Sequence, residues 1–416
     1  MDKKSILPWG LSQNLWALFA TSVISAIGFS ITMPYMSLYL NNVLKLSMTT
    51  VGTLLMVAQV IGAGVGIYGG EISDKLGRKF IMVRSLTGRF LLFIIIGIII
   101  LKWENIYAIF TFLILNSIFF SFYFPASQAY IADITSEQER ISAYGLLRMG
   151  GNLGWALGPG IGGLLASIDY AYLFFVTAFC MLIATIILIK FCRESLNYRI
   201  IKKSESTKIK NQKNQNFNLN FKDIFTILYD HQFLTFTGIS FLIFIVWGHL
   251  VSPISVYTVN RIGITQSQLG LLFSINGFMV VLFQYFLTHF IPDKKELDAL
   301  WIGSLIYAAG YLSIGFARSF KFLILSMIII TVAEMIITPS SQTYASKISR
   351  PENRGRYMAF YNIAQTFGWA IGPLLGGILL DAFPARNITM WAIVSAIAAL
   401  SAMGFIFYKN AKSRKN

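Results

Sequence analysis

Residues 154–163 read Gly-Trp-Ala-Leu-Gly-Pro-Gly-Ile-Gly-Gly, and residues 368–377 read Gly-Trp-Ala-Ile-Gly-Pro-Leu-Leu-Gly-Gly. The two segments lie 214 residues apart, and no gap is needed to extend the match from Pro125 to Leu165. A biased composition does not place Trp and Gly-Pro in register, so the chain contains two copies of one structural unit. The same offset also aligns Pro125, Ser127, Gln128, Tyr130 and Arg140 with Pro339, Ser341, Gln342, Tyr344 and Arg354.

The composition indicates a membrane protein. Hydrophobic residues make up 56% of the 416 positions and charged residues only 12%, whereas soluble domains carry about 25% charged residues. Continuous apolar runs of about 20 residues, the length that crosses a bilayer as a helix, predict an all-α fold rather than a β-barrel. Twelve runs are predicted, at Trp16–Leu40, Met48–Gly70, Phe80–Leu101, Ile106–Ile131, Ala143–Ile168, Tyr172–Cys192, Phe233–Tyr257, Gln268–Ile291, Ala299–Ala317, Phe322–Ala345, Met358–Phe383 and Thr389–Tyr408.

A long polar stretch, roughly residues 193–230, separates helices 6 and 7 and is rich in Lys, Asn, Gln and Ser. It divides the chain into an N-terminal six-helix bundle (1–192), a linker (193–231) and a C-terminal six-helix bundle (232–416). We expect the bundles to be related by a pseudo-twofold axis. Parallel repeats of this kind are typical of secondary transporters, whose substrate site lies near the bilayer midplane between the halves.

The net charge of +16 falls mainly into alternate loops, which argues against a nucleic-acid partner. By the positive-inside rule this bias places both termini and the linker in the cytoplasm. We expect a multi-pass protein of a bacterial cell membrane, with membrane lipids around it. Cys180 and Cys192 have no pairing or metal spacing, so no metal or cofactor is expected. A phosphate-binding loop and enzyme motifs are missing, which favours an ion gradient as the driving force over ATP or catalysis.

Residues 70–79, which read Gly-Glu-Ile-Ser-Asp-Lys-Leu-Gly-Arg-Lys, connect the predicted helices 2 and 3. The two glycines permit a tight turn, and the charged side chains can simply anchor the topology. The spacing resembles the signature loop of the major facilitator superfamily. That resemblance implies the twelve-helix fold and gating roles for Gly70, Asp74, Gly77, Arg78 and Lys79, with the Asp74–Arg78 pair stabilising the state closed toward the cytoplasm. The corresponding loop of the second half lacks the glycines.

Glycines recur at intervals of four in the two repeated segments, and such stripes let helix backbones approach closely. The first copy resembles the helix-5 motif of the drug:proton antiporters of the same superfamily, which favours export. Because the second copy is nearly identical, a general packing role for both stays open. The residues concerned are Gly154, Gly158, Pro159, Gly162 and Gly163, with Gly368, Gly372, Pro373, Gly376 and Gly377.

Glu334 lies among isoleucines within the predicted tenth helix, about 20 Å deep when counted from Lys347. An acid inside the membrane is costly and is by default a proton or cation site. Its repeat equivalent is Phe120, so the carboxyl group occurs in one half only. The surrounding residues resemble helix 10 of proton-coupled multidrug exporters. We predict that Glu334 carries the coupling proton; a structural hydrogen bond is the alternative.

Other candidates are weaker. Asp133 ends helix 4 and is a second proton-coupling candidate, although a helix cap is an equal alternative. Arg84 and Arg89 are expected to anchor helix 3 at the cytoplasmic surface. The helix-4 arginine motif of the antiporters is missing, because residues 116–124 contain no base. The residues predicted to line the substrate cavity are Arg148, Asn152, Asn116, His249, Asn276, Asn362 and Gln365. For Arg148 an equal alternative is that it reaches the cytoplasmic face, and for His249 the alternative is a structural hydrogen bond.

The sequence therefore predicts a monomeric, proton-coupled exporter of small lipophilic or amphipathic compounds that works by alternating access. Two alternatives stay open. One is a proton-linked carrier of a sugar, nucleoside, lipid or other metabolite. The other is a membrane sensor or scaffold that transports nothing.

Overall fold

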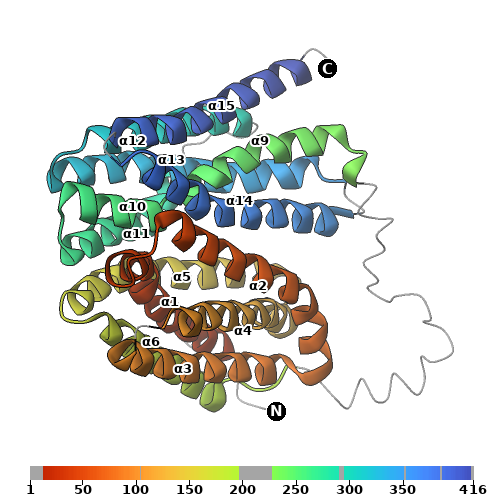
Figure 1. Cartoon of the computed structure of the whole chain (residues 1–416). Coiled ribbons are helices and arrows are strands. Elements are labelled where there is room, and N and C mark those ends of the chain that lie inside the picture. The colour runs from red at the N-terminus through yellow and green to blue at the C-terminus, as the bar shows by residue number, and fades with distance from the viewer. Residues whose placement is uncertain are drawn as a thin grey trace.

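The computed structural model describes residues 13–103, 105–195, 227–289, 295–350, 353–384 and 387–413, and their regular structure is entirely helical. Two bundles lie one above the other (Figure 1). The first bundle contains α1 (Gln13–Leu38) with its π-helical extension η1 (Tyr39–Val43), α2 (Met48–Leu76), α3 (Arg78–Lys102), α4 (Ile106–Ile134), α5 (Glu137–Ala166) and α6 (Tyr170–Phe191). The second contains α9 (His231–Gly248), α10 (Ser252–Tyr257), the π-helical η2 (Thr258–Ile262), α11 (Gln266–His289), α12 (Glu296–Phe316), α13 (Phe320–Ile348), α14 (Arg354–Ala382) and α15 (Asn387–Ser413).

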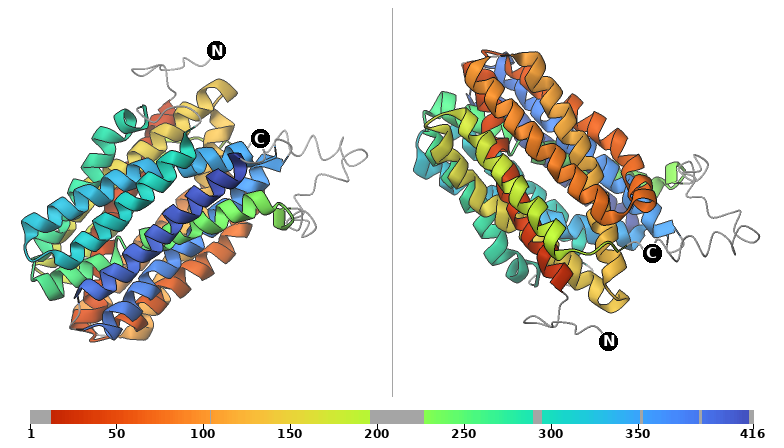
Figure 2. Two further views of the ribbon diagram at one scale, coloured as in Figure 1. Left: turned by 90° about the horizontal axis from the view of Figure 1, so that it is seen from above. Right: turned by 90° about the horizontal axis from the view of Figure 1, so that it is seen from below.

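The long helices lie lengthwise beside one another in each bundle, as the two further views show (Figure 2). Within the described residues, 11 helical segments are long and apolar enough to cross a membrane. The twelfth segment, α5, is 30 residues long but is rich in glycine and begins with charged residues. It runs beside α1 and α11 in the same manner as the others. The predicted all-α fold with twelve membrane-crossing segments is confirmed, and the chain is a multi-pass membrane protein.

One predicted helix is wrong in detail. The run from Phe233 to Tyr257 was expected to form one continuous helix, but the chain breaks between α9 and α10. Pro253 lies in the first turn of α10, and a proline supplies no backbone N–H to continue the preceding helix. The break follows Gly248, whose Cα touches Gly372 of α14.

Side chains that accept hydrogen bonds from first-turn amides begin many of the helices, as helix N-termini require. Ser136 and Glu139 form a complete capping box at α5. Single caps begin several other helices and are supplied by Ser47 (α2), Asn105 (α4), Asp169 (α6), Asp230 (α9) and Ser319 (α13).

The glycine stripes hold α5 and α14 against their neighbours inside each bundle. A Cβ on Gly154 or Gly158 would overlap α1 at Ala26 or Ser30, and one on Gly162 would lie 2.5 Å from the Ile31 carbonyl oxygen. In the second bundle Gly368, Gly372 and Gly376 face α9 and α10 in the same way, meeting Phe244, Gly248 and Pro253. Only glycine permits this separation of the helix backbones.

Gly163 and Gly377, the last glycine of each stripe, face the other bundle instead. A Cβ on Gly163 would lie 2.5 Å from the carbonyl oxygen of Gln266 in α11, and one on Gly377 would overlap that of Met48 in α2. Each seam also has a glycine on its other helix. Gly270 of α11 lies against Pro159, and Gly52 of α2 lies against Pro373. The α5–α11 and α2–α14 seams are therefore built alike. This equivalence relates the bundles by the expected pseudo-twofold symmetry.

The two ends of the molecule differ. We call the end with the α1–α2 connection the loop-1 face, and the opposite end, where α2 meets α3 at Gly77 and α6 ends, the linker face. The four seam glycines lie toward the loop-1 face. A Cβ on Gly145, toward the linker face of α5, or on Gly151, at the middle of that helix, would meet nothing within 4 Å.

Candidate functional site

Glu334 is the midpoint of α13, fourteen residues from each end of the helix. At 1.5 Å per residue this places it about 21 Å from either end. The side chain is partly accessible even though it lies at this depth. Tyr307 and Tyr311 of α12 lie close enough to interact electrostatically with the carboxyl group, and both are buried.

The carboxyl group is held by a neutral partner. Nδ2 of Asn276, on α11, donates to Oε2 of Glu334 at 3.0 Å and to Oγ1 of Thr331 at 2.9 Å. Thr331 is fully buried and donates in turn to the Met327 carbonyl oxygen at 2.7 Å. These hydrogen bonds fix the amide so that an N–H points at the carboxylate, which suits the ionised form. Among the described residues, no cation forms an ion pair with Glu334.

The surroundings of Glu334 include the first bundle. Arg148 of α5 acts electrostatically on the carboxyl group, and Trp247 of α9 is a further polar neighbour. The Arg148 side chain is exposed and Asn152, one turn along the same helix, is partly buried. Next to Asn276, Gly277 lies against Ala156 of α5, so the acid is level with the contact between the bundles.

The remaining predicted cavity residues lie elsewhere. Asn116 bonds to Arg89 inside the first bundle. His249 is fully buried at the α9–α10 break, where Nδ1 lies 2.9 Å from the Ile245 carbonyl oxygen, and it faces no open space. Asn362 is exposed and Gln365 partly buried, and both lie on α14.

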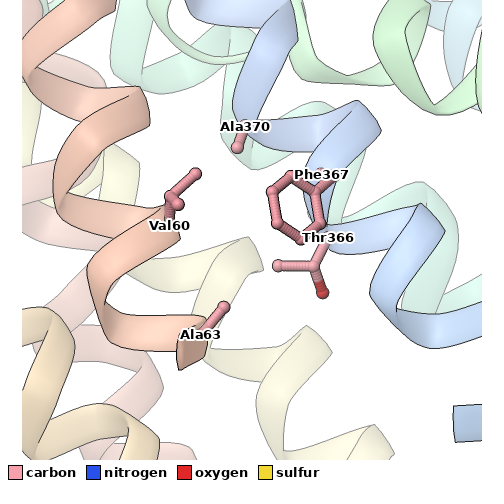
Figure 3. Close-up of a pocket in the computed structure, with 5 residues that line it drawn as sticks. All are labelled: Val60, Ala63, Thr366, Phe367 and Ala370. Carbon is pink, nitrogen blue, oxygen red and sulfur yellow. The ribbon is translucent and has the colours of Figure 1, made fainter. Parts of the chain in front are cut away.

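Asn362 shares its stripe on α14 with Thr366 and Ala370. A gap in the α2–α14 seam is lined by Val60, Ala63, Thr366, Phe367 and Ala370 (Figure 3). The Thr366 hydroxyl is the sole polar side-chain group among these five residues, and the space between them is too narrow for a water molecule. The gap is a packing defect along the seam and is separate from Glu334.

The predicted gating loop forms an ion-pair cluster within the first bundle. Arg78 pairs with Asp74, and its Nη1 donates to Ser73 Oγ at 3.2 Å. Gly77 has φ of +108°, in the region that favours glycine. Lys79 donates through Nζ to the Ile189 carbonyl oxygen of α6 at 2.9 Å. The space beside Gly70 is open, since a Cβ there would meet nothing within 4 Å.

Asp133 joins this cluster at the linker face. Its Oδ2 accepts from Arg78 Nε at 3.3 Å and from Ser195 Oγ at 2.8 Å. The side chain is 31% exposed, so it lies at the surface rather than beside Glu334. We assign it to the loop cluster and not to proton coupling.

Glu194 completes the cluster and was missed in the sequence. Its carboxylate accepts from the backbone amides of Arg78 at 2.8 Å, Lys79 at 3.3 Å and Phe80 at 3.2 Å. A carboxylate at a helix N-terminus satisfies the free amides and the helix dipole together. The start of α3 is therefore tied to the segment that follows α6.

The loop-1 face carries hydrogen bonds between the bundles. Asn260 of η2 bonds to Asn42 of η1 through both amides, at 2.9 and 2.7 Å. Ser37 donates to Ser252 at 2.7 Å. Two π-helical turns, one at the end of each repeat's first helix, thus meet at this face. Such turns are rare and frequently mark functional sites.

The prediction for Arg89 is wrong. It was expected to anchor α3 at the cytoplasmic surface, but it lies 11 residues into the helix and is 2% exposed. The helix-4 region does contain no base, and Arg89 reaches it from α3 by bonding to Asn116. Arg84, one turn nearer the linker face, lies over the Phe80 ring with Cζ 5.0 Å from its centroid.

Two equivalent six-helix bundles that meet along paired seams, with the acid Glu334 at mid-membrane beside them, define the class of twelve-helix secondary transporters. The sequence profile of the Major Facilitator Superfamily matches residues 18–298 and 296–416. The chain belongs to this superfamily and is one of its transporters.

Relatives and solved structures agree with this assignment. The chain is 25% identical to an uncharacterized MFS-type transporter, YqjV of Bacillus subtilis (strain 168), over 92% of this chain and 91% of that one. It is 26% identical to multidrug resistance protein 1 of the same organism, again over 92% and 91%. The solved structure of the nucleoside transporter NupG is similar with a TM-score of 0.77 and 14% identity, covering 95% of this chain and 98% of that one. The last likeness shows the fold alone.

Proposed function

We propose that this protein is a proton-coupled exporter of small lipophilic or amphipathic compounds, with Glu334 as the group that exchanges a proton for the substrate. One observation carries the proposal: Glu334 lies at mid-membrane, partly accessible, bonded to the neutral Asn276 and facing the first bundle. A carboxyl group without a bonded cation can gain and lose a proton without breaking an ion pair. The multidrug-resistance name of one relative supports the choice of substrate class.

Alternating access has a structural basis in the difference between the two faces. The bundles are joined at the loop-1 face by the Asn42–Asn260 and Ser37–Ser252 bonds and by the four seam glycines. From the middle of α5 to its linker end, there is open space beside Gly151 and Gly145. This arrangement fits a state closed at the loop-1 face, in which Glu334 communicates with the linker face. The Asp74–Arg78 pair is formed in this state although it was expected to mark closure toward the cytoplasm, so we assign it to holding the loop within its own bundle. Rocking of the bundles about the seams would expose it to the other side.

The charge distribution supports a cytoplasmic linker face. Lysines and arginines gather there at the ends of α2, α13 and α15 and at the starts of α3 and α14, as the positive-inside rule requires for cytoplasmic loops. We therefore propose a cell-membrane location with both termini in the cytoplasm. A membrane-impermeant maleimide applied to intact cells should label Lys45→Cys and not Lys347→Cys, in a background without Cys180 and Cys192. The reverse pattern would invert the topology.

Proteoliposomes with an imposed pH gradient test the coupling. We expect the wild type to move a lipophilic fluorescent cation such as ethidium against its concentration gradient. Glu334→Gln should abolish this accumulation while keeping exchange of dye down its gradient, because the amide preserves shape but carries no proton. Glu296→Gln is the matched control, since Glu296 pairs with Lys347 at the linker end of α12.

Three outcomes would count against the proposal. Gradient-driven accumulation that is unchanged in Glu334→Gln would remove the proton role of this acid. Saturable flux of a polar metabolite with none of the dye would favour a metabolite carrier. Absence of flux for every solute in the wild type would favour a non-transporting sensor.

A further inference from the structure

Arg89 is a buried cation that takes no part in the proposed proton coupling. It lies 11 residues from the start and 13 from the end of α3, at about half the depth of the membrane, and is 2% exposed. Charged side chains at this depth are rare and costly, and they mark binding sites or ion pathways unless they are paired. An arginine that only fixed the helix in the membrane would lie near its end.

The guanidinium is only partly satisfied. Its one hydrogen bond to the described part of the chain runs from Nε to Oδ1 of Asn116, at 2.9 Å. Nη2 is buried and has no hydrogen-bond partner among the described residues. Arginine carries five N–H donors in a planar fork, and among the described residues no hydrogen bond from either Nη group accompanies that of Nε, with Nη2 buried as well. The phenol of Tyr123, also buried, is the titratable side chain beside it.

Aromatic rings cover the remaining sides of the cation. Cζ of Arg89 lies 5.7 Å from the centroid of Phe120 and 5.9 Å from that of Phe93. Rings at this distance attract a cation through their quadrupole but accept no hydrogen bond in place of an anion. The Arg89 charge is thus held by an amide and two rings.

Phe120 of α4 covers one side of the Arg89 guanidinium and is itself exposed on its other side. It is the repeat equivalent of Glu334, which faces the other bundle, and it is 47% exposed. Its ring stacks on Phe29 of α1 at 6.3 Å, and Phe29 meets Trp155 of α5 edge-on at 6.1 Å. The position that carries an acid in the second half therefore carries, in the first half, a ring with a buried cation behind it.

We propose that Arg89 is an anion-binding site, specifically for a carboxylate attached to an aromatic body, and that Phe120 is its movable cover. A carboxylate matches the two free Nη groups of the fork in a bidentate pair. Asn116 holds Nε and so orients the fork. The rings of Phe29 and Trp155, which lie beyond the cover, suit an aromatic body. This inference rests on the proposed transport function, because the ligand would be a transported compound; it adds that aromatic carboxylates are among the compounds moved, beside the lipophilic cations used to test the coupling.

Benzoate and its neutral isostere benzamide test the site on the purified full-length protein in detergent, by thermal unfolding. We expect benzoate to raise the unfolding midpoint of the wild type in a saturable manner and benzamide to have no such effect. Arg89→Gln should weaken benzoate binding at least tenfold. Arg89→Lys, which keeps the charge but loses the fork, should fall between the two. Phe120→Ala should bind benzoate at least as well as the wild type, because the cover is gone.

Several results would overturn the site. Equal stabilisation by benzoate and benzamide, or benzoate binding that survives in Arg89→Gln, would exclude Arg89 as its determinant. If benzoate stabilises neither the wild type nor Phe120→Ala, Arg89 is likewise excluded as the determinant of benzoate binding. If Arg89→Gln does not fold, Arg89→Lys and Phe120→Ala decide the question. Glu334→Gln should bind benzoate normally, so loss of proton-driven flux with intact benzoate binding would concern the coupling proposal and not this one.

Discussion

Asp381, at the last turn of α14, caps the first turn of α2 across the boundary between the bundles: its Oδ2 accepts from the backbone amide of Thr49 at 2.7 Å. The same carboxylate accepts from Thr49 Oγ1 at 2.7 Å and, through Oδ1, from the Met48 amide at 3.1 Å. An acid at a helix N-terminus is stabilised by the free amides and by the dipole. Here the helix and its cap belong to different bundles, so the contact must break when the loop-1 face opens.

We expect Asp381→Ala to favour opening of the loop-1 face. Loss of such a cap costs about 1–2 kcal/mol, which corresponds to roughly a tenfold change in the equilibrium between closed and open states. Hydrogen exchange of the first turn of α2 measures this directly, because the amides of Met48 and Thr49 lose their acceptor. Asp169→Ala is the matched control, since Asp169 caps α6 within its own bundle by accepting from Ala171 at 2.7 Å. Faster exchange in α2 for both variants alike would contradict a specific role for Asp381.

Glu194 should govern the order of the gating loop. Glu194→Ala leaves the amides of Arg78, Lys79 and Phe80 without their shared acceptor. We expect faster hydrogen exchange at the start of α3 and a loss of about 1–2 kcal/mol of local stability. Glu71→Ala is the control: its pair with Lys75 is 62% and 70% exposed, and such surface pairs contribute about 0–1 kcal/mol. If both variants behave like the wild type, Glu194 does not hold the loop.

Gly158 tests whether the first glycine stripe serves packing. A Cβ at this position would overlap Ser30 Oγ and lie 2.7 Å from the Ile27 carbonyl oxygen. Ser30 also donates to the Gly154 carbonyl oxygen at 2.9 Å, a bond that the added methyl group would disturb. We expect Gly158→Ala to destabilise the protein by about 1–3 kcal/mol and to lower its unfolding midpoint in detergent. Gly151→Ala, where the Cβ meets nothing within 4 Å, should be neutral or stabilising by up to about 1 kcal/mol. Equal midpoints for the two variants would exclude the packing role.

The fold was predictable because the sequence contains two copies of the same structural unit. Gly163 and Gly377 stand 214 residues apart in the sequence, and in the structure each one lets its helix touch the other bundle. The same repetition indicates two equivalent bundles before any contact is known. The break at Pro253 was not predicted, because hydropathy alone runs unbroken from α9 into η2; the proline was the available signal.

Glu334, Asn276 and Arg148 of the candidate site could be named from the sequence, but the way they pair could not. Glu334 stands out because an acid among isoleucines has one plausible kind of role, but its partner Asn276 lies 58 residues away and no linear pattern joins them. Arg89 was predicted to lie at the membrane surface. Counting residues from the helix end, as was done for Glu334, would have placed it near mid-membrane. Asp381 gave no signal, since acids at helix ends are common and only the tertiary structure shows which helix an acid caps.

Asn276 should decide how well Glu334 works as a proton carrier. Its Nδ2 donates to Glu334 Oε2 at 3.0 Å, and a hydrogen bond to a charged group is worth about 1.5–3 kcal/mol. Asn276→Leu keeps the volume but removes this donor, so the ionised acid loses its support at mid-membrane. We expect gradient-driven dye accumulation in proteoliposomes to fall about tenfold or more, while exchange down the gradient continues. Gln232→Leu removes an exposed amide at the linker end of α9 and should change neither rate by more than about twofold, because exposed substitutions away from special features cost within about 0.5 kcal/mol. Accumulation by Asn276→Leu at the wild-type rate would mean that the Asn276–Glu334 bond takes no part in coupling.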